Sequence, residues 1–295
     1  MEIRPFRPDD AAPLAELAAA CARGETDFVL NPLWEEPEEV LADFDRFGID
    51  PAEHLLVAED DEGRVASLAG FLRRPRDPLA GLVCPVVRRE DRGQGLGGRV
   101  LREALARGSG KLGIKVASAA VGVRNRAGYA LLASQGFRPT HQVYLMRCDR
   151  RPEPAPLPVE GLVVEDAPPE RADELLALFH ACGFEERCDA ELRALIGDPR
   201  TRHLVARRND ELVAFVELAM HWPRRPWVAY VGVVKELRER GLATALVSRA
   251  LSEAFERSAE HALLLLSPAN RTALRAYEKV GFHRHRLLDV MVKGL

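Results

Sequence analysis

The sequence predicts an α/β protein of two similar domains, each with a mixed, mostly antiparallel sheet flanked by helices. Three observations lead to this prediction. The length of 295 residues suits two domains of ordinary size. A proline-rich segment lies near the middle of the chain, and the order of strand-like and helix-like segments is the same on both sides of it. That order, β-α-β-β-β-α-β-α-β, allows one right-handed parallel crossover in each otherwise antiparallel sheet.

Residues 1–150 are expected to form the first domain and residues 161–295 the second, with a linker at residues 151–160. Every second residue of this linker, from Pro152 to Pro158, is a proline. Proline interrupts helices and is excluded from central strands. We therefore expect an extended, semi-rigid spacer between the domains.

Each half is expected to open with a strand and an Ala/Leu-rich helix, at residues 2–6 and 11–21 and again at residues 162–165 and 170–182. A hairpin with polar turn residues follows, at residues 54–71 and 203–218. The acidic stretch at residues 34–47 is also expected to be helical, either as a solvated face or as a wall of an acceptor site.

The later part of each half begins with an apolar strand, a glycine-containing turn and an amphipathic helix, at residues 82–106 and 227–255. A further strand is expected at residues 114–121 and 262–266. An asparagine, a short helix, a Gly-Phe pair and a last strand then complete each half.

Composition excludes several functional classes. The chain has 47% hydrophobic and 29% charged residues, and its 42 Lys and Arg against 45 Asp and Glu exclude a strongly basic nucleic-acid surface over the whole chain. It shows no secretory leader and no apolar run of the ~18 residues that a membrane helix needs. Five cysteines without a C-x-x-C pair are expected to be reduced thiols without a metal. We therefore expect a cytoplasmic protein with no membrane, nucleic-acid or metal partner.

The first chemical motif is R-x-x-G-x-G/A, at residues 92–97 and 238–243. It lies between a strand and a helix in both halves. Glycine lets the backbone turn tightly, and the N–H groups at a helix N-terminus suit a diphosphate. The alternative is an ordinary strand-to-helix turn that contains glycine for steric reasons.

The first copy also fits the dinucleotide pattern G-x-G-x-x-G, through Gly93, Gly95 and Gly98. That pattern needs an acidic residue ~20 positions later for the ribose hydroxyls. None occurs between Ala104 and Cys148, and the corresponding turn of the second half has one glycine, Gly241. We therefore reject a nicotinamide site.

The second motif is N-x-x-A-x-x-x-Y-x-x-x-G-F, at residues 270–282. Asn270 is suited to cap a short helix and Gly281 to end it. Tyr277 lies one helical turn after Ala273 and on the same side as Asn270. The first half repeats the asparagine and the Gly-Phe pair at residues 125–137 but has Leu132 at the tyrosine position.

With these two motifs in the same order and register in both halves, the sequence resembles the GNAT superfamily of N-acetyltransferases, as a tandem pair of the kind that mycothiol synthases share. The resemblance implies that acetyl-CoA lies in a V-shaped split between the strands at residues 227–234 and 262–266. It implies direct transfer of the acetyl group to an amine. Most of the acceleration would then come from positioning.

The resemblance also implies roles for individual residues. Tyr277 would protonate the departing thiolate, and the backbone N–H near Val231 would stabilise the oxyanion. Val233 would pair with the pantetheine arm like an added strand. In the second half the implied acetyl-CoA contacts are Val233, Arg238, Glu239, Arg240, Gly241, Leu242, Ala243, Thr244 and Asn270. In the first half they are Val87, Arg92, Gly93, Gln94, Gly95, Leu96, Gly97, Gly98 and Asn125.

The first half departs from the pattern at the positions that carry chemistry. Leu132 replaces the acid, and Tyr129 lies nearly one turn away from that position. Pro85 stands where Val231 stands in the second half and has no N–H to offer an oxyanion. We expect the first domain to keep the fold and to lack catalysis. The alternative is that another group replaces the tyrosine there.

Glu217 and His221 are the candidates for the general base. They lie four residues apart, so strand alternation would place both on one face, and histidine has a suitable pKa for this task. The alternatives are that both are merely solvated residues or that a water chain serves as the base. His54 and His203 recur at strand starts in both halves, which favours a structural role for them.

The expected function is acetyl-CoA-dependent N-acetylation of a small-molecule amine by the second domain. A non-catalytic acyl-CoA-binding or regulatory protein is the alternative, against which Tyr277 counts. A different acyl group remains open.

Overall fold

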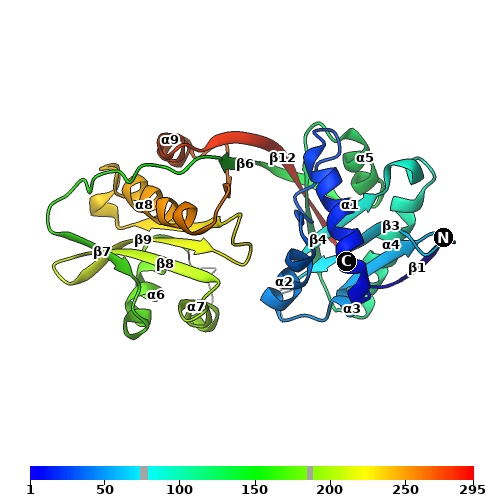
Figure 1. The fold of residues 1–295 in the computed structure, drawn as a ribbon, viewed down its shortest axis with the longest axis horizontal. Helices are drawn as coiled ribbons and strands as arrows, with labels where there is room; N and C mark the ends of the chain where they lie inside the picture. Colours follow the sequence, from blue (N-terminus) through cyan, green and yellow to red (C-terminus); the bar gives the residue numbers. More distant parts are fainter. Residues whose placement is uncertain (74–78, 185–188) are drawn as a thin grey trace. The chain divides into compact units, whose positions relative to one another are not determined.

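The computed structural model describes residues 1–73, 79–184 and 189–295, and tertiary contacts divide them into two units (Figure 1). The first unit contains Met1–Val143 and Arg286–Leu295, and the second contains Tyr144–His285. Each is an α/β unit with a mixed sheet, as the sequence predicts. None of the helices in the described ranges is long and apolar enough to cross a membrane.

The first unit follows the predicted order. Its sheet contains the strands β1 (Glu2–Pro5), β2 (Leu55–Glu59), β3 (Val65–Leu72), β4 (Leu79–Val87) and β5 (Val116–Gly122). Its helices are α1 (Ala11–Arg23), α2 (Pro37–Phe47), α3 (Pro51–His54), α4 (Leu96–Gly110) and α5 (Arg126–Ser134). The acidic stretch at residues 34–47 is mostly helical, as predicted. The helix α2 covers most of it and buries Val40 and Phe44.

The second unit repeats this order, except that no helix corresponds to α3 in the described residues before β8. Its sheet contains β7 (Leu162–Asp166), β8 (Thr201–Arg208), β9 (Glu211–Ala219), β10 (Trp227–Val233) and β11 (Ala262–Leu266). Its helices are α6 (Ala172–Ala181), α7 (Asp189–Ile196), α8 (Leu242–Arg257) and α9 (Arg271–Val280). The sequence did not predict α7. Short 3₁₀ turns precede α1, α4, α6 and α8 in the corresponding places.

The core of the second unit lies on both faces of its sheet. On one face α8 buries Leu246 and Leu251 with Val216 of β9. On the other, α6 and α7 bury Phe179 and Leu192 with Phe215 of β9 (Figure 1). β9 is therefore apolar at successive positions, as expected for a strand that is covered on both sides.

The last strand of each half joins the sheet of the other half. β12 (His283–Gly294) pairs antiparallel with β5, from Leu288 against Gly122 to Gly294 against Val116. The second half of β6 (Arg138–Cys148) pairs antiparallel with β11, from Tyr144 against Leu266 to Cys148 against Ala262. The unit boundaries therefore fall within these two strands and differ from the boundaries drawn at the proline-rich segment.

Residues 151–160 are counted with the second unit and lie against α8. The Arg151 Nε donates a hydrogen bond to the Ser252 hydroxyl at 2.9 Å, and the Ala155 amide donates one to the Ser248 hydroxyl at 2.9 Å. Leu157 packs on the core of this unit. The segment is irregular, as its prolines require, and is held along a helix.

The parallel strands of each crossover pair only near their start. Among the described residues, β10 pairs with β11 at Trp227–Leu263 alone, and β4 pairs with β5 at the three positions from Leu79 to Gly81. A bulge interrupts the pairing of β10 with β9 between Val228 and Tyr230. Residues 231–233 of β10 therefore lie beyond the pairing with β11, where the two strands leave a split between them.

The strand exchange predicts where a core substitution will act. Met291 of β12 is fully buried opposite Ala119 of β5. Met291→Ala should lower the free energy of unfolding by about 2–5 kcal/mol through the cavity that it leaves. In amide hydrogen exchange, β5 should lose protection while β9 keeps it.

The partly exposed neighbour Val292 provides the control, because Val292→Ala should have a smaller effect. Loss of protection in β9 rather than β5 would contradict the assignment of β12 to the first unit.

Candidate active site

The turn before α8 has the geometry of an anion-binding corner. Glu239 and Gly241 both have left-handed backbone conformations, with φ of 62° and 91°. Gly241 is the N-cap of α8, and no side chain caps this helix. The Nε of Arg238 donates a hydrogen bond to the Val233 carbonyl at 2.9 Å, which ties the turn to the end of β10. Unpaired N–H groups and the helix dipole make this corner suitable for phosphate.

A cavity of about 600 Å³ lies in front of this corner. Residues 231–233 of β10 form one wall, the turn and the first residues of α8 form the second, and α9 forms the third. The predicted residues that line it are Val231, Val233, Arg238, Glu239, Gly241, Leu242, Ala243, Thr244, Asn270 and Tyr277. Arg240 is absent from this lining.

Tyr277 is held on the α9 wall by the local motif. The side-chain oxygen of Asn270 accepts a hydrogen bond from the Ala273 amide at 3.1 Å, and Gly281 ends the helix with φ of 112°. The Tyr277 ring packs edge-on against Phe282 at 5.7 Å between centroids. Burial raises the pKa of the Tyr277 phenol to about 12, so the group is protonated at neutral pH and can donate a proton.

The sequence motifs did not identify two cationic residues of α9 as part of the site. Arg275 and Lys279 are exposed, lie one helical turn apart, and line the same cavity. Their spacing of four residues within the second motif was the signal that could have identified them. Cations that line a cavity favour an anionic ligand in it.

Cys182 is a further lining residue that the sequence did not single out. Burial raises the pKa of its thiol. A thiol with a raised pKa is a poor nucleophile at neutral pH, because the thiolate is the reactive form.

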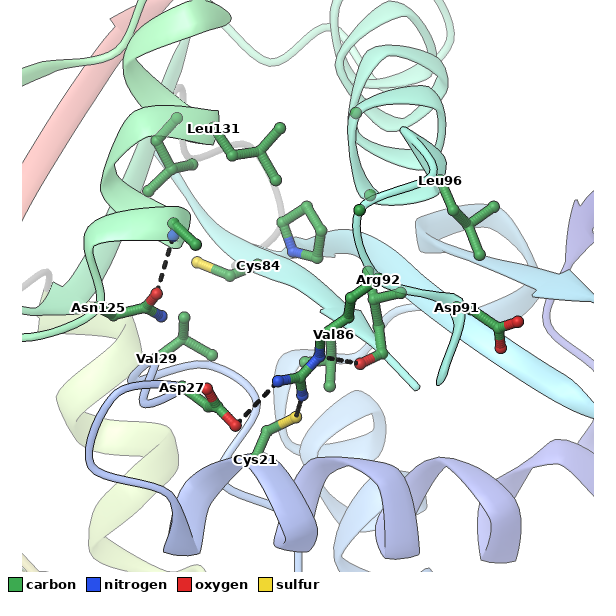
Figure 2. A pocket seen from close by; sticks show the side chains of 18 of the residues that line it. Cys21, Asp27, Val29, Cys84, Val86, Asp91, Arg92, Leu96, Asn125 and Leu131 are labelled. Carbon is green, nitrogen blue, oxygen red and sulfur yellow. Dashed lines mark hydrogen bonds and ion pairs between the residues drawn. The ribbon is translucent and has the colours of Figure 1, made fainter. Parts of the chain in front are cut away.

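The first unit repeats the corner. Gly93 and Gly95 have φ of 78° and 79°, and Gly95 is the N-cap of α4. The Nε of Arg92 donates a hydrogen bond to the Val87 carbonyl at 2.9 Å, as Arg238 does to Val233. The other guanidinium nitrogens of Arg92 contact Asp27 at 2.9 Å and the Cys21 sulfur at 3.3 Å (Figure 2).

The cavity of the first unit is smaller, at about 240 Å³. The predicted residues that line it are Val87, Arg92, Gly93, Gly95, Leu96, Gly97, Gly98 and Asn125, without Gln94. Pro85 and Leu132 also line it, at the positions where the second unit has Val231 and Tyr277. This cavity therefore has neither the amide nor the phenol.

The chain itself occupies the split of the first unit. Val29 forms an antiparallel bridge with Val121 of β5, and the Leu30 amide donates a hydrogen bond to the Ala120 carbonyl at 2.9 Å. On the other side the Cys84 amide of β4 donates one to the Asn31 carbonyl at 3.0 Å. The short segment at residues 28–31 thus forms hydrogen bonds with backbone groups of both strands that border the split.

Neither candidate base lines the cavity of the second unit. Glu217 lies in β9, where its side chain is 4% exposed and contacts the His203 Nε2 at 2.9 Å. β9 ends at Ala219, so strand alternation does not reach His221. The His221 ring instead rests beside Trp222, with centroids 4.9 Å apart.

The apparent repetition of His54 and His203 is not a structural one. His54 is the last residue of α3, whereas His203 lies inside β8. The sheet registers show which residue corresponds to His203. Leu68 of β3 pairs with Val86 in the same way that Phe215 of β9 pairs with Gly232. Two residues further along each strand, Gly70 pairs with Leu55 and Glu217 pairs with His203, so the counterpart of His203 is Leu55.

Among the residues that the structure describes, no group of His, Cys, Asp and Glu side chains is arranged to hold a metal ion. The cavity of the second unit therefore offers main-chain amides, exposed cations and one protonated phenol. This set can hold a phosphorylated ligand and protonate a leaving group.

Comparisons with known proteins agree with this geometry. Residues 17–137 and 170–282 match the acetyltransferase (GNAT) family. The chain is 31% identical to mycothiol acetyltransferase of Thermobispora bispora, over 99% of this chain and 98% of the relative.

Two solved structures share the fold over 99% of this chain. A GCN5-related N-acetyltransferase from Sphaerobacter thermophilus has a TM-score of 0.79 at 23% identity and is covered to 95%. A tandem GNAT protein from the clavulanic acid biosynthesis pathway has a TM-score of 0.73 at 18% identity and is covered to 98%.

The backbone conformation at the two corners predicts that Gly95 and Gly241 respond equally to replacement by alanine. A Cβ at Gly95 or Gly241 meets nothing within 4 Å, so the cost of alanine there is the left-handed backbone alone. Gly95→Ala and Gly241→Ala should each lower the free energy of unfolding by about 1–2 kcal/mol, measured by urea denaturation. Gly197→Ala, at an uncrowded position without positive φ, should cost much less. Equal values for all three variants would refute the role of the backbone conformation.

Proposed function

The chain belongs to the acetyltransferase (GNAT) family and is a tandem member of it, and we propose that its second unit transfers the acetyl group of acetyl-CoA directly to the amine of a small molecule. The observation that carries this proposal is the position of Tyr277 on the wall of a cavity that begins at the corner of Arg238 to Thr244. The relative named mycothiol acetyltransferase supports a small-molecule acceptor.

The proposed binding mode follows the three walls of the cavity. The amides of residues 241–244 receive the diphosphate at the N-terminus of α8. The pantetheine arm pairs with the available edge of β10 at Val231 and Val233, as an added strand would. Arg275 and Lys279 attract the phosphates from the α9 side. This placement brings the thioester toward Tyr277.

The proposed reaction is a direct displacement. The amine nitrogen bonds to the acetyl carbon while the oxygen charge is stabilised by the amide near Val231. The bond from carbon to sulfur breaks, and Tyr277 gives its proton to the thiolate. The raised pKa of Cys182 supports direct transfer, since it argues against an acetylated thiol at this residue.

We propose that the first unit does not catalyse the reaction. Leu132 and Pro85 line its cavity where a phenol and an amide would be needed, and residues 28–31 occupy its split. Its preserved corner, with Arg92, Gly93 and Gly95, supports the second candidate function, a site that binds an acyl-CoA or another phosphorylated ligand for regulation. Release of CoA with a panel of small amines separates these candidates, because a purely regulatory protein would release none.

Tyr277→Phe tests the proposed acid. It removes the hydroxyl and keeps the ring, so kcat should fall by about 10²–10⁴-fold while the KM for acetyl-CoA changes little. Steady-state release of CoA with an active amine measures both constants. Tyr129→Phe is the matched control in the first unit and should leave kcat unchanged. An unchanged kcat in Tyr277→Phe would exclude the phenol as the acid.

Arg275→Ala and Lys279→Ala test the proposed phosphate contacts. Because exposed ion pairs contribute ~0.2–1 kcal/mol, each change should raise the KM for acetyl-CoA by about 1.5–5-fold and leave kcat unchanged. The increase should diminish at high salt. Arg271→Ala removes an exposed arginine of the same helix that does not line the cavity. A rise of KM in this control equal to that in the other two variants would mean that α9 attracts the donor only through its general charge.

A further inference from the structure

A carboxylate of the chain itself occupies the corner arginine of the first unit. The Nη1 of Arg92 lies 2.9 Å from Oδ2 of Asp27, and its Nη2 lies 3.3 Å from the Cys21 sulfur (Figure 2). Both Arg92 and Asp27 line the cavity of this unit, and their side chains are 36% and 34% exposed. A guanidinium binds carboxylate and phosphate through the same nitrogens. Asp27 therefore holds the group that a phosphate in this cavity would contact.

The corner arginine of the second unit is different. Arg238 makes the same bond to a strand carbonyl and also lies beside a cysteine, Cys182, but in the described ranges it pairs with no carboxylate. The charged residues that line the two cavities differ in the same sense. They are Asp27, Asp91 and Arg92 in the first unit and Arg238, Glu239, Arg275 and Lys279 in the second. Charge therefore favours a phosphorylated ligand in the second cavity.

Asp27 is held beside Arg92 by the residue that follows it. The Phe28 carbonyl accepts a hydrogen bond from the Gly122 amide at 3.0 Å and another from the Asn125 Nδ2 at 3.3 Å. The Phe28 ring is 2% exposed, and the guanidinium of Arg286 lies over it at 5.4 Å. Folding has thus already ordered the carboxylate, so an external phosphate competes with a preorganised group and approaches its negative charge.

We propose that Asp27 is an internal competitor for phosphate that closes the corner of the first unit, so that the chain binds acetyl-CoA at the second unit alone. Asp27 thereby determines which of two similar corners receives the donor. The choice of acetyl-CoA as the ligand rests on the proposed function, whereas the competition at Arg92 concerns any ligand with a diphosphate.

Titration of the full chain with CoA is the first test. Calorimetry should give one CoA per chain. In hydrogen exchange, CoA should protect residues 242–244 and leave residues 96–98 unchanged. These amides precede the first helical hydrogen bonds, from Ala245 to Gly241 in α8 and from Arg99 to Gly95 in α4. Two CoA molecules per chain, or protection of residues 96–98, would overturn the proposal and support the second candidate function.

Asp27→Ala removes the internal carboxylate. Inorganic diphosphate is the probe, because it needs the corner and not the split that residues 28–31 occupy. Its affinity for the first unit, measured from protection of residues 96–98, should rise by about 3–10-fold, since one attractive pair is gained and one like-charge contact is lost. The gain should shrink at high salt. An unchanged affinity at residues 96–98 would overturn the proposal.

Glu25→Ala is the matched control from the same segment. Glu25 pairs with Arg124 and does not line the cavity. Its removal should leave the affinity of the first unit for diphosphate unchanged. An equal gain in both variants would also overturn the proposal, because the effect would then come from general charge. Unchanged protection of β5 in each variant establishes that the sheet has folded.

The competition at Arg92 and the proposed function have separate readouts. If CoA protects residues 242–244 alone but no amine causes its release from acetyl-CoA, the proposed function fails and the role of Asp27 stands. If CoA is released and also protects residues 96–98 of the unsubstituted protein, the role of Asp27 is wrong and the proposed function stands. If CoA protects neither corner, both fail.

Discussion

The short pairing of two parallel strands is the constraint on which the site of the second unit depends. Among the described residues β10 and β11 pair at Trp227–Leu263 alone, and a bulge in β10 follows directly. Main-chain N–H and C=O groups that lack a partner strand must find another partner or water. The edge at Val231 to Val233 lines the cavity of the second unit, where we propose that an extended ligand pairs with it. The crossover helix α8 starts at the same cavity, with Gly241 as its N-cap and no capping side chain, so its first amides suit an anionic group there.

The two units share the same backbone corner but differ in what fills the split beside it. Both tie the corner to the preceding strand through an arginine Nε and a strand carbonyl, Arg92 to Val87 and Arg238 to Val233. In the first unit residues 28–31 satisfy the backbone groups of the split, whereas in the second the β10 edge borders a larger cavity. The chemical groups follow the same division, because the second unit has the Tyr277 phenol where the first has Leu132. Each sheet also receives its last strand from the other half of the chain.

Much of the fold could be predicted from local sequence signals. Strand periodicity, the glycine-containing turns and the caps at Asn125 and Asn270 are determined by neighbours in the chain, and the structure has these elements in the predicted order. The exchange of β6 and β12 could not be predicted, since both strands carry the same kind of alternating pattern and would fit either sheet. The occupied split of the first unit involves residues 28–31, which have no periodic pattern.

The site was predictable to the extent that it is built from contiguous motifs. The corner and Tyr277 belong to such motifs and line one cavity. The contact between His203 and Glu217 depends on the register of β8 with β9, which the sequence did not determine, so the match of His54 with His203 was misleading. The expectation that Glu217 and His221 share a strand face was wrong because β9 ends at Ala219. Arg275 and Lys279 were missed because the motif was interpreted only through its asparagine, tyrosine and glycine.

Amide hydrogen exchange of the full chain, with and without acetyl-CoA, tests most directly whether the open split belongs to the second unit. The account predicts that the ligand protects amides of residues 231–233, which pair with the pantetheine arm, and amides of residues 241–244, which receive the diphosphate. It predicts that the Cys84 amide exchanges equally slowly in both conditions, because Asn31 already accepts its hydrogen bond. Protection of β4 by acetyl-CoA, with no change in β10, would contradict the account.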